Sequence, residues 1–167
     1  MNDAHLHLVV NHFPIIGIIF GIGILIIGLI IKNQSIKNTA FVLFIIAAIF
    51  GFASMNTGEG AEEIAEKLPG VTEQLIETHE ELAEMFSLFL YTTGLLSIIS
   101  LFLAYKKMAF VKFTSLATVG VAIIAVFFAQ QTGRSGGEIR HTEIRANSTT
   151  VVDGLTSQEN EIKTDDD

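Results

Sequence analysis

The sequence predicts an all-α fold, a bundle of four transmembrane helices, from its composition and from the spacing of its apolar stretches. Of the 167 residues, 50% are hydrophobic and only 17% are charged, against roughly 25% in ordinary soluble domains. Four apolar stretches are each long enough to cross a bilayer, where lipid offers the backbone no hydrogen-bond partner outside a helix. We expect the spans at about 8–31, 39–57, 79–105 and 108–131.

Composition also excludes several classes of function. The chain has no cysteine, which excludes disulfides, iron–sulfur clusters, thiolate zinc sites and covalently attached haem. Its net charge of −8 argues against nucleic acid as a partner. No nucleophile–base constellation, phosphate-binding loop or dinucleotide fingerprint is present, so an electron carrier or accessory subunit is favoured over a stand-alone catalyst.

The first span is the clearest. His12–Ile31 is 20 residues without a formal charge, and at about 1.5 Å per residue it covers roughly 30 Å, one bilayer core. It lacks the basic leader and small-residue cleavage site of a signal peptide. Pro14 either opens this helix at its first turn or kinks a helix that begins earlier.

The other three spans follow from similar apolar runs. The second is Thr39–Thr57 and the fourth is Met108–Gln131, interrupted only by Lys112. The third has its apolar run at Met85–Tyr105, and its helix begins earlier. Thr78 and Glu81 form a capping box, which favours a start there over a start at Thr72.

The short loops predict the orientation of the protein. Lys32–Asn38 and Tyr105–Lys107, together with Lys112, hold five of the ten lysines and arginines and no acid. Because basic loops favour the cytoplasmic side, both termini and the middle connection should be extracytoplasmic. The segment Glu59–Glu84 carries nine glutamates and one lysine. We expect a membrane domain at 1–145 and an acidic, disordered tail at 146–167.

A partial internal repeat indicates two tandem helix hairpins related by a pseudo-two-fold axis along the membrane normal. With a shift of about 75 residues, Phe52–Gly58 overlies Phe127–Gly133, Lys32 overlies Lys107, and His5 falls close to His79. In this alignment the Thr-Gly pairs end spans two and four at the outer surface, where glycine suits a helix C-terminus.

All five histidines fall on the predicted outer side, and His79 is the most informative. On a helix it shares an apolar stripe with Leu75, Leu82 and Phe86, so it should point into the bundle. Neutral imidazole is a good ligand for iron, copper or zinc. Two histidines on facing helices would clamp a haem b. Small residues would make room for it, namely Gly17, Gly21, Ala48 and Ala83.

The sequence also resembles a bacterial family of four-span membrane proteins of unknown function. The likeness lies in His7–Ile15, with its His-Phe-Pro-Ile run, in Thr57-Gly58 followed by His79, and in Gly136-Gly137-Glu138-x-x-His141. Members of this family sometimes occur joined to cytochrome c-like domains, so the resemblance implies respiratory redox work in a bacterial cytoplasmic (inner) membrane. It also implies that the histidines to test are His7, His12, His79 and His141.

The leading hypothesis is therefore a haem b protein for electron transfer, or a subunit of a redox complex. His12 and His79 are the expected axial pair, because they come from different spans, and His7 and His141 are the supporting or alternate ligands. A second hypothesis is a non-catalytic membrane subunit whose acidic outer face docks a partner. A third is copper or zinc handling by His5, His7, His141 and Glu138. The expected partners are the lipid bilayer, an extracytoplasmic redox protein or quinol, and a second copy of the chain.

Overall fold

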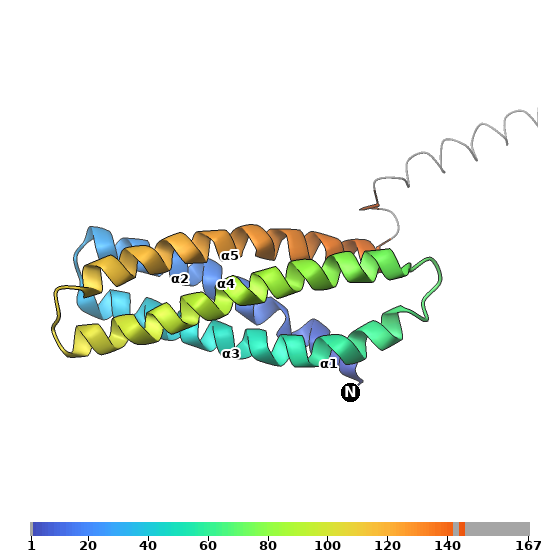
Figure 1. The fold of residues 1–167 in the computed structure, drawn as a ribbon, viewed down its shortest axis with the longest axis horizontal. Coiled ribbons are helices and arrows are strands. Elements are labelled where there is room, and N and C mark those ends of the chain that lie inside the picture. The colour runs from blue at the N-terminus through green and yellow to red at the C-terminus, as the bar shows by residue number, and fades with distance from the viewer. Residues whose placement is uncertain (1, 142–143, 146–167) are drawn as a thin grey trace, which may run out of the picture.

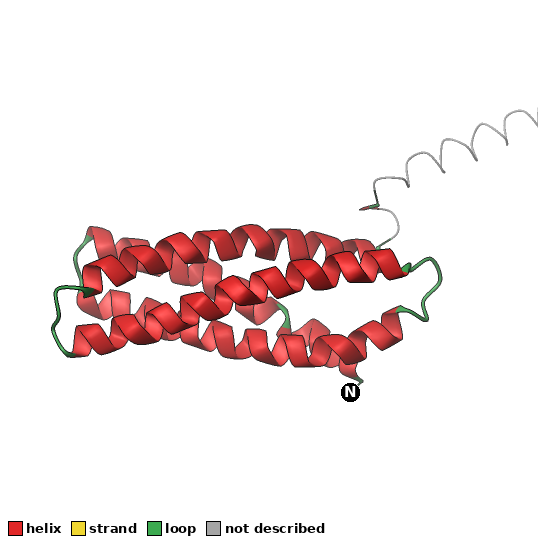
Figure 2. Ribbon diagram, in the orientation of Figure 1, coloured by secondary structure: helices red, strands yellow, loops and turns green. Residues whose placement is uncertain are grey.

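The chain is a bundle of four long helices, seen in a computed structural model that describes residues 2–141 and 144–145 (Figure 1). Figure 2 shows helices joined by short connections and no strand in the described part. This confirms the all-α prediction, whereas the predicted tail 146–167 lies outside the described residues. The helices are α1 (Asp3–Val10), α2 (His12–Ile30), α3 (Gln34–Ala65), α4 (Glu73–Tyr105) and α5 (Val111–Arg140).

The bundle has the dimensions and the surface of a multi-pass membrane protein. Four helices are long and apolar enough to cross a membrane, with α1 and α2 together counting as the first. Many large apolar side chains are exposed, which a soluble monomer avoids and a lipid-facing surface requires. They include Phe20, Ile49, Leu95, Ile123 and Phe127.

The helices extend beyond the predicted spans at one end of the bundle. Helix α3 continues through Gly58 to Ala65, and α5 continues through Gly133 to Arg140, so the Thr-Gly pairs do not end these helices. Helix α4 has Thr72 as its N-cap, so the predicted start at Thr78 is wrong. The Thr78 hydroxyl donates to the Gln74 carbonyl within the helix instead of capping it.

The first span begins as a separate short helix. Helix α1 ends at Val10, and Asn11 separates it from α2. Pro14 explains the break, because proline has no N–H to bond the carbonyl four residues earlier, at Val10, and its ring crowds that carbonyl. Of the two readings of Pro14, the structure shows the interrupted helix that begins earlier. Helix α1 then packs against α3.

The two hairpin loops have the same backbone geometry. Lys32 and Lys107 have φ of 55° and 54°, the left-handed conformation that ends many helices. After each lysine, the next backbone N–H donates to a carbonyl five residues earlier, from Asn33 to Gly28 and from Met108 to Leu103. This is the Schellman pattern of a helix C-terminus, and it supports the predicted pair of hairpins.

Small residues let the helices approach closely inside each hairpin and between the hairpins. Gly17 on α2 packs on Ala47 of α3, and Gly94 on α4 packs on Ala48 of α3. In the second hairpin, alanines and hydroxyl residues fill the interface, and most of the hydroxyls donate to carbonyls of their own helix. Fully buried members are Thr93, Ser97, Ser100, Ser115, Thr118 and Ala122. Such packing is typical of membrane helices.

We expect Gly17→Leu to destabilise the bundle. A Cβ atom at Gly17 would lie 2.9 Å from the Ala47 Cβ, so α2 and α3 must separate, at a cost of about 1–3 kcal/mol in unfolding free energy. The matched control is Gly23→Leu, because a Cβ atom at Gly23 has nothing within 4 Å. Unfolding in mixed micelles, followed by circular dichroism, measures both variants. Equal stability of the two would contradict the close approach.

Candidate functional site

All five histidines lie at one end of the bundle, here called the histidine end. It comprises α1, the connection between α3 and α4, and the C-terminal end of α5 (Figure 1). The two lysine-bearing loops lie at the opposite end (Figure 1). The five imidazoles are nevertheless held very differently, and only two of them point into the bundle.

His7 is half-buried and is held by α3. Its Nδ1 atom lies 3.0 Å from the Ser54 carbonyl and 3.3 Å from the Thr57 hydroxyl. The ring packs beside Gly58, where a Cβ atom would lie 3.8 Å from the imidazole Cε1. Helix α1 therefore turns this imidazole toward a hydroxyl, a carbonyl and a glycine on the facing helix.

His79 is half-buried and is held by α5 through the same kinds of group. Its Nδ1 atom lies 2.9 Å from the Ser135 hydroxyl, and the ring also hydrogen bonds to the Thr132 backbone. A Cβ atom at Gly136 would lie 2.9 Å from the imidazole Cε1, so only glycine admits the ring in this position. The inward direction expected from the apolar stripe is the one observed.

The two histidine sites repeat each other residue by residue. The pattern hydroxyl-x-x-hydroxyl-glycine occurs at 54–58 on α3 and at 132–136 on α5. Each member of the second set lies 78 positions after its counterpart, from 54 to 132, from 57 to 135 and from 58 to 136. The predicted shift of about 75 holds at the lysine loops, but at the histidine end it is three residues short for these segments and three residues long for His7 and His79, which are 72 positions apart.

The hydrogen bonds determine which ring nitrogen carries the proton. The Thr57 hydroxyl donates to the Ala53 and Ser54 carbonyls, and the Ser135 hydroxyl donates to the Thr132 carbonyl. With their single hydrogen used, these oxygens accept a hydrogen bond from Nδ1–H of the histidine, and a carbonyl can only accept. In both neutral imidazoles the proton is therefore on Nδ1, and Nε2 keeps its lone pair.

His7 and His79 are the two half-buried imidazoles of the histidine end, one from each hairpin. They come from α1 and α4, and each is anchored to the helix that follows it in its own hairpin. Histidines that bind a metal are commonly held in this way, because a hydrogen bond from Nδ1–H orients the ligand nitrogen Nε2.

The other three histidines are exposed. His12, one of the expected axial pair, lies on the surface, and its Nδ1 bonds the Leu8 carbonyl at 3.0 Å beside the break between α1 and α2. His5 follows the N-cap of α1, and His141 follows the last residue of α5. The structure thus points His7 and His79 inward and leaves His12 exposed.

The segment around Glu138 is helical. Helix α5 continues through Gly136 and Gly137, and Arg134 pairs with Glu138 at 3.0 Å along the same helix. Arg145 instead donates to the Glu138 and Ile139 carbonyls and to the Gly70 carbonyl. These hydrogen bonds satisfy backbone carbonyls at the C-terminal end of α5 and link that end to the connection between α3 and α4.

Acidic side chains surround the histidine end without forming a metal site. Glu62 lies beyond the apolar part of α3, and burial, followed by the nearby charges of Glu80, Glu66 and Glu59, raises the pKa of its carboxyl group. Within the described part of the chain, no three histidine, aspartate or glutamate side chains are arranged to hold a metal ion. The alternative set His5, His7, His141 and Glu138 is therefore not gathered into one centre.

The small residues expected to make room for a cofactor are used for helix packing. The sites beside Gly17 and Gly21 are filled by Ala47 and Phe44 of α3, and Ala48 packs on Gly94. The glycines next to the imidazoles are Gly58 and Gly136.

Sequence reasoning missed the anchoring residues Ser54, Thr57, Thr132 and Ser135. The repeated hydroxyl-x-x-hydroxyl-glycine pattern is the signal that identifies them.

Comparison of the chain with known protein families, with curated proteins and with solved structures gave no match. The roles assigned to the histidines therefore rest on the geometry of this chain.

We expect His7 and His79 to be Nδ1–H tautomers when neutral, because their Nδ1 atoms face a carbonyl and hydroxyls whose own hydrogens are already donated. Long-range proton–nitrogen correlation spectra of histidine-labelled protein at pH 8 report the tautomer directly. Exposed His5 is the internal reference and should show the Nε2–H form that free imidazole prefers. Identical nitrogen shifts for all three would contradict the anchoring.

Proposed function

We propose that this multi-pass membrane protein binds one haem b between His7 and His79 and serves as an electron carrier or a subunit of a redox complex. The observation that carries the proposal is the matched pair of inward imidazoles, each fixed through Nδ1, so that Nε2 is the nitrogen that would bind iron. His7 takes the axial role that the sequence alone assigned to His12.

The number of ligands favours haem over a bare metal ion. Copper or zinc sites need three or four protein ligands, and no three such side chains are grouped within the described residues. A haem supplies four ligands of its own, so two axial histidines complete its coordination. A porphyrin also suits a chain without cysteine, because haem b needs no thioether attachment.

The residues around the pair have defined tasks in such a site. When bound, the haem supplies one-electron chemistry. The Thr57 and Ser135 hydroxyls hold the imidazole rings in position, and their hydrogen bonds increase the basicity of Nε2. Gly58 and Gly136 let the rings lie against the helix backbones.

We further propose that the histidine end faces the extracytoplasmic side of a bacterial inner membrane. The support is the basic character of the two loops at the other end, with Lys32, Lys37, Lys106, Lys107 and Lys112. In that orientation the haem would exchange electrons with an extracytoplasmic carrier or with a quinol in the outer leaflet.

Addition of haem to the purified protein should produce a Soret band of a six-coordinate, low-spin species. His7→Ala and His79→Ala should each abolish that species, since each removes one axial ligand. His12→Ala and His5→Ala are the matched controls and should bind haem like the unmodified chain, because both rings are exposed. Absorption and electron paramagnetic resonance spectra check these outcomes.

A second pair of variants tests the position of the ring and not the ligand itself. Gly136→Leu should displace His79 and weaken haem binding at least tenfold, because its Cβ would lie 2.9 Å from the imidazole. Gly133→Leu, one turn earlier on α5, meets nothing within 4 Å and should leave haem binding unchanged. Haem binding that survives in both His7→Ala and His79→Ala would overturn the proposed function.

The orientation is tested with cysteine labelling, which the cysteine-free chain allows directly. Glu77→Cys at the histidine end should react with a membrane-impermeant maleimide on intact spheroplasts, because the residue is exposed. Ser35→Cys, exposed at the opposite end, should react only after permeabilisation. The reverse labelling pattern would place the histidine end in the cytoplasm.

A further inference from the structure

A groove on the outer surface of the bundle follows the seam between α3 and α4, where the two hairpins meet. Its apolar half encloses about 390 Å³, and its other half, about 520 Å³, includes polar groups at the histidine end. Phe52 and Tyr91 line both halves, so the two halves are continuous. The groove is separate from the histidine pair.

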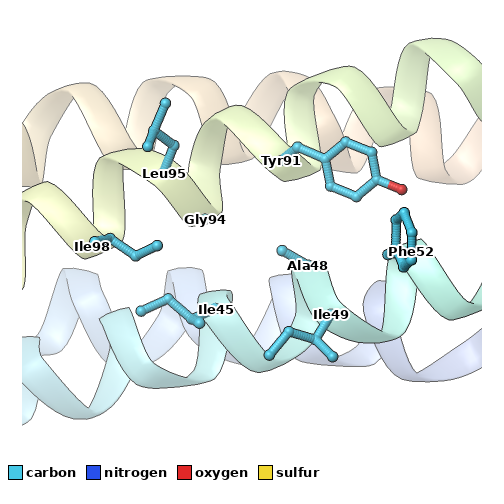
Figure 3. Close-up of a pocket in the computed structure, with 8 residues that line it drawn as sticks. All are labelled: Ile45, Ala48, Ile49, Phe52, Tyr91, Gly94, Leu95 and Ile98. Atoms are coloured by element: carbon cyan, nitrogen blue, oxygen red, sulfur yellow. The ribbon is translucent and has the colours of Figure 1, made fainter.

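The apolar half is a shallow groove, open on its outer side, that a hydrocarbon chain could follow. Ile49 and Leu95 form its walls, and both side chains are more than half exposed. Ala48 and Gly94, two small residues in close contact, lie between them (Figure 3). From Ile45 to Phe52 the channel extends seven residues along α3, about 10 Å at the helical rise.

Two aromatic rings stand where the apolar half gives way to the polar half. Figure 3 shows the Phe52 and Tyr91 rings together at one end of the row of lining residues, with the Tyr91 hydroxyl directed toward Phe52. Aromatic side chains favour stacked or edge-on contact with another ring. A flat aromatic headgroup fits this position better than the tetrahedral phosphate of a phospholipid.

The polar half presents hydrogen-bond acceptors with negative charge. It is lined by the exposed side chains of Glu59 and Glu84, together with Asn56 and Ser87. Carboxylates accept hydrogen bonds from hydroxyl groups, whereas they repel a phosphate anion. This charge disfavours an anionic headgroup and favours one that donates hydrogen bonds, as the hydroxyls of a quinol do.

We propose that the groove between α3 and α4 binds a quinol that carries a long apolar tail. The quinol ring contacts Phe52 and Tyr91, its hydroxyls donate to Glu59 or Glu84, and its tail lies along the channel between Ile49 and Leu95. Binding of the quinol depends only on these groove residues. The proposed quinol site is therefore independent of whether His7 and His79 bind haem.

The test is photo-crosslinking of the full chain in phosphatidylcholine nanodiscs, with an azido-substituted benzoquinol that carries a ten-carbon tail. Labelled peptides should fall within 45–59 and 84–98, and the same quinol without the azide should compete. Ile49→Trp should abolish the labelling by filling the channel. Ile123→Trp is the matched control, since Ile123 is a similarly exposed isoleucine on α5, and it should label normally.

Glu84→Gln tests the headgroup contact and should raise the competitor concentration needed for half-displacement five- to tenfold.

Three outcomes would overturn the proposal. The first is equal labelling of Ile49→Trp and the unmodified chain. The second is displacement of the label by phosphatidylethanolamine as effectively as by the quinol. The third is crosslinking of two copies of the chain to each other through this seam, with no quinol label in it. None of these outcomes depends on haem, whose binding is read separately from its Soret band.

Discussion

The need to satisfy every backbone polar group inside lipid governs this structure. The spans are helical throughout apart from the break at Asn11, and the buried hydroxyls of the second hairpin, such as Thr93, Ser97 and Thr118, donate to carbonyls of their own helices. Imidazoles are placed only at the histidine end, where Ser54 and Thr132 supply the carbonyls that bind them. The chemistry is therefore confined to one end by the same constraint that builds the scaffold.

The internal repeat gives that end its symmetry. Each hairpin contributes one inward imidazole and one hydroxyl-x-x-hydroxyl-glycine segment on the helix that follows it. The repeat therefore places two similarly anchored imidazoles at one end of the bundle. The lysine loops repeat as well, with Lys32 and Lys107 in the same left-handed conformation.

The lengths of the apolar runs were sufficient to predict four membrane-spanning helices, because a segment that crosses lipid must be long and apolar. The apolar stripe on the third span predicted the inward direction of His79. The run lengths were not sufficient for the helix ends, since α3 and α5 continue as helices beyond the apolar runs, where hydropathy gives no signal. The choice between His7 and His12 depended on the break at Asn11, which changes the direction of α1 relative to α2. The predicted repeat shift of about 75 differs by three residues from the shift of 78 between the two hydroxyl-x-x-hydroxyl-glycine segments. It therefore did not align the hydroxyl residues that hold the imidazoles.

The interruption at Asn11 makes the two imidazoles mechanically unequal. His79 belongs to the uninterrupted helix α4, so its position is fixed by the whole span. His7 belongs to an eight-residue helix joined to its span at a single residue, where the buried Asn11 Oδ1 has no hydrogen-bond partner. The position of His7 therefore depends on the docking of α1 against α3, whereas that of His79 does not.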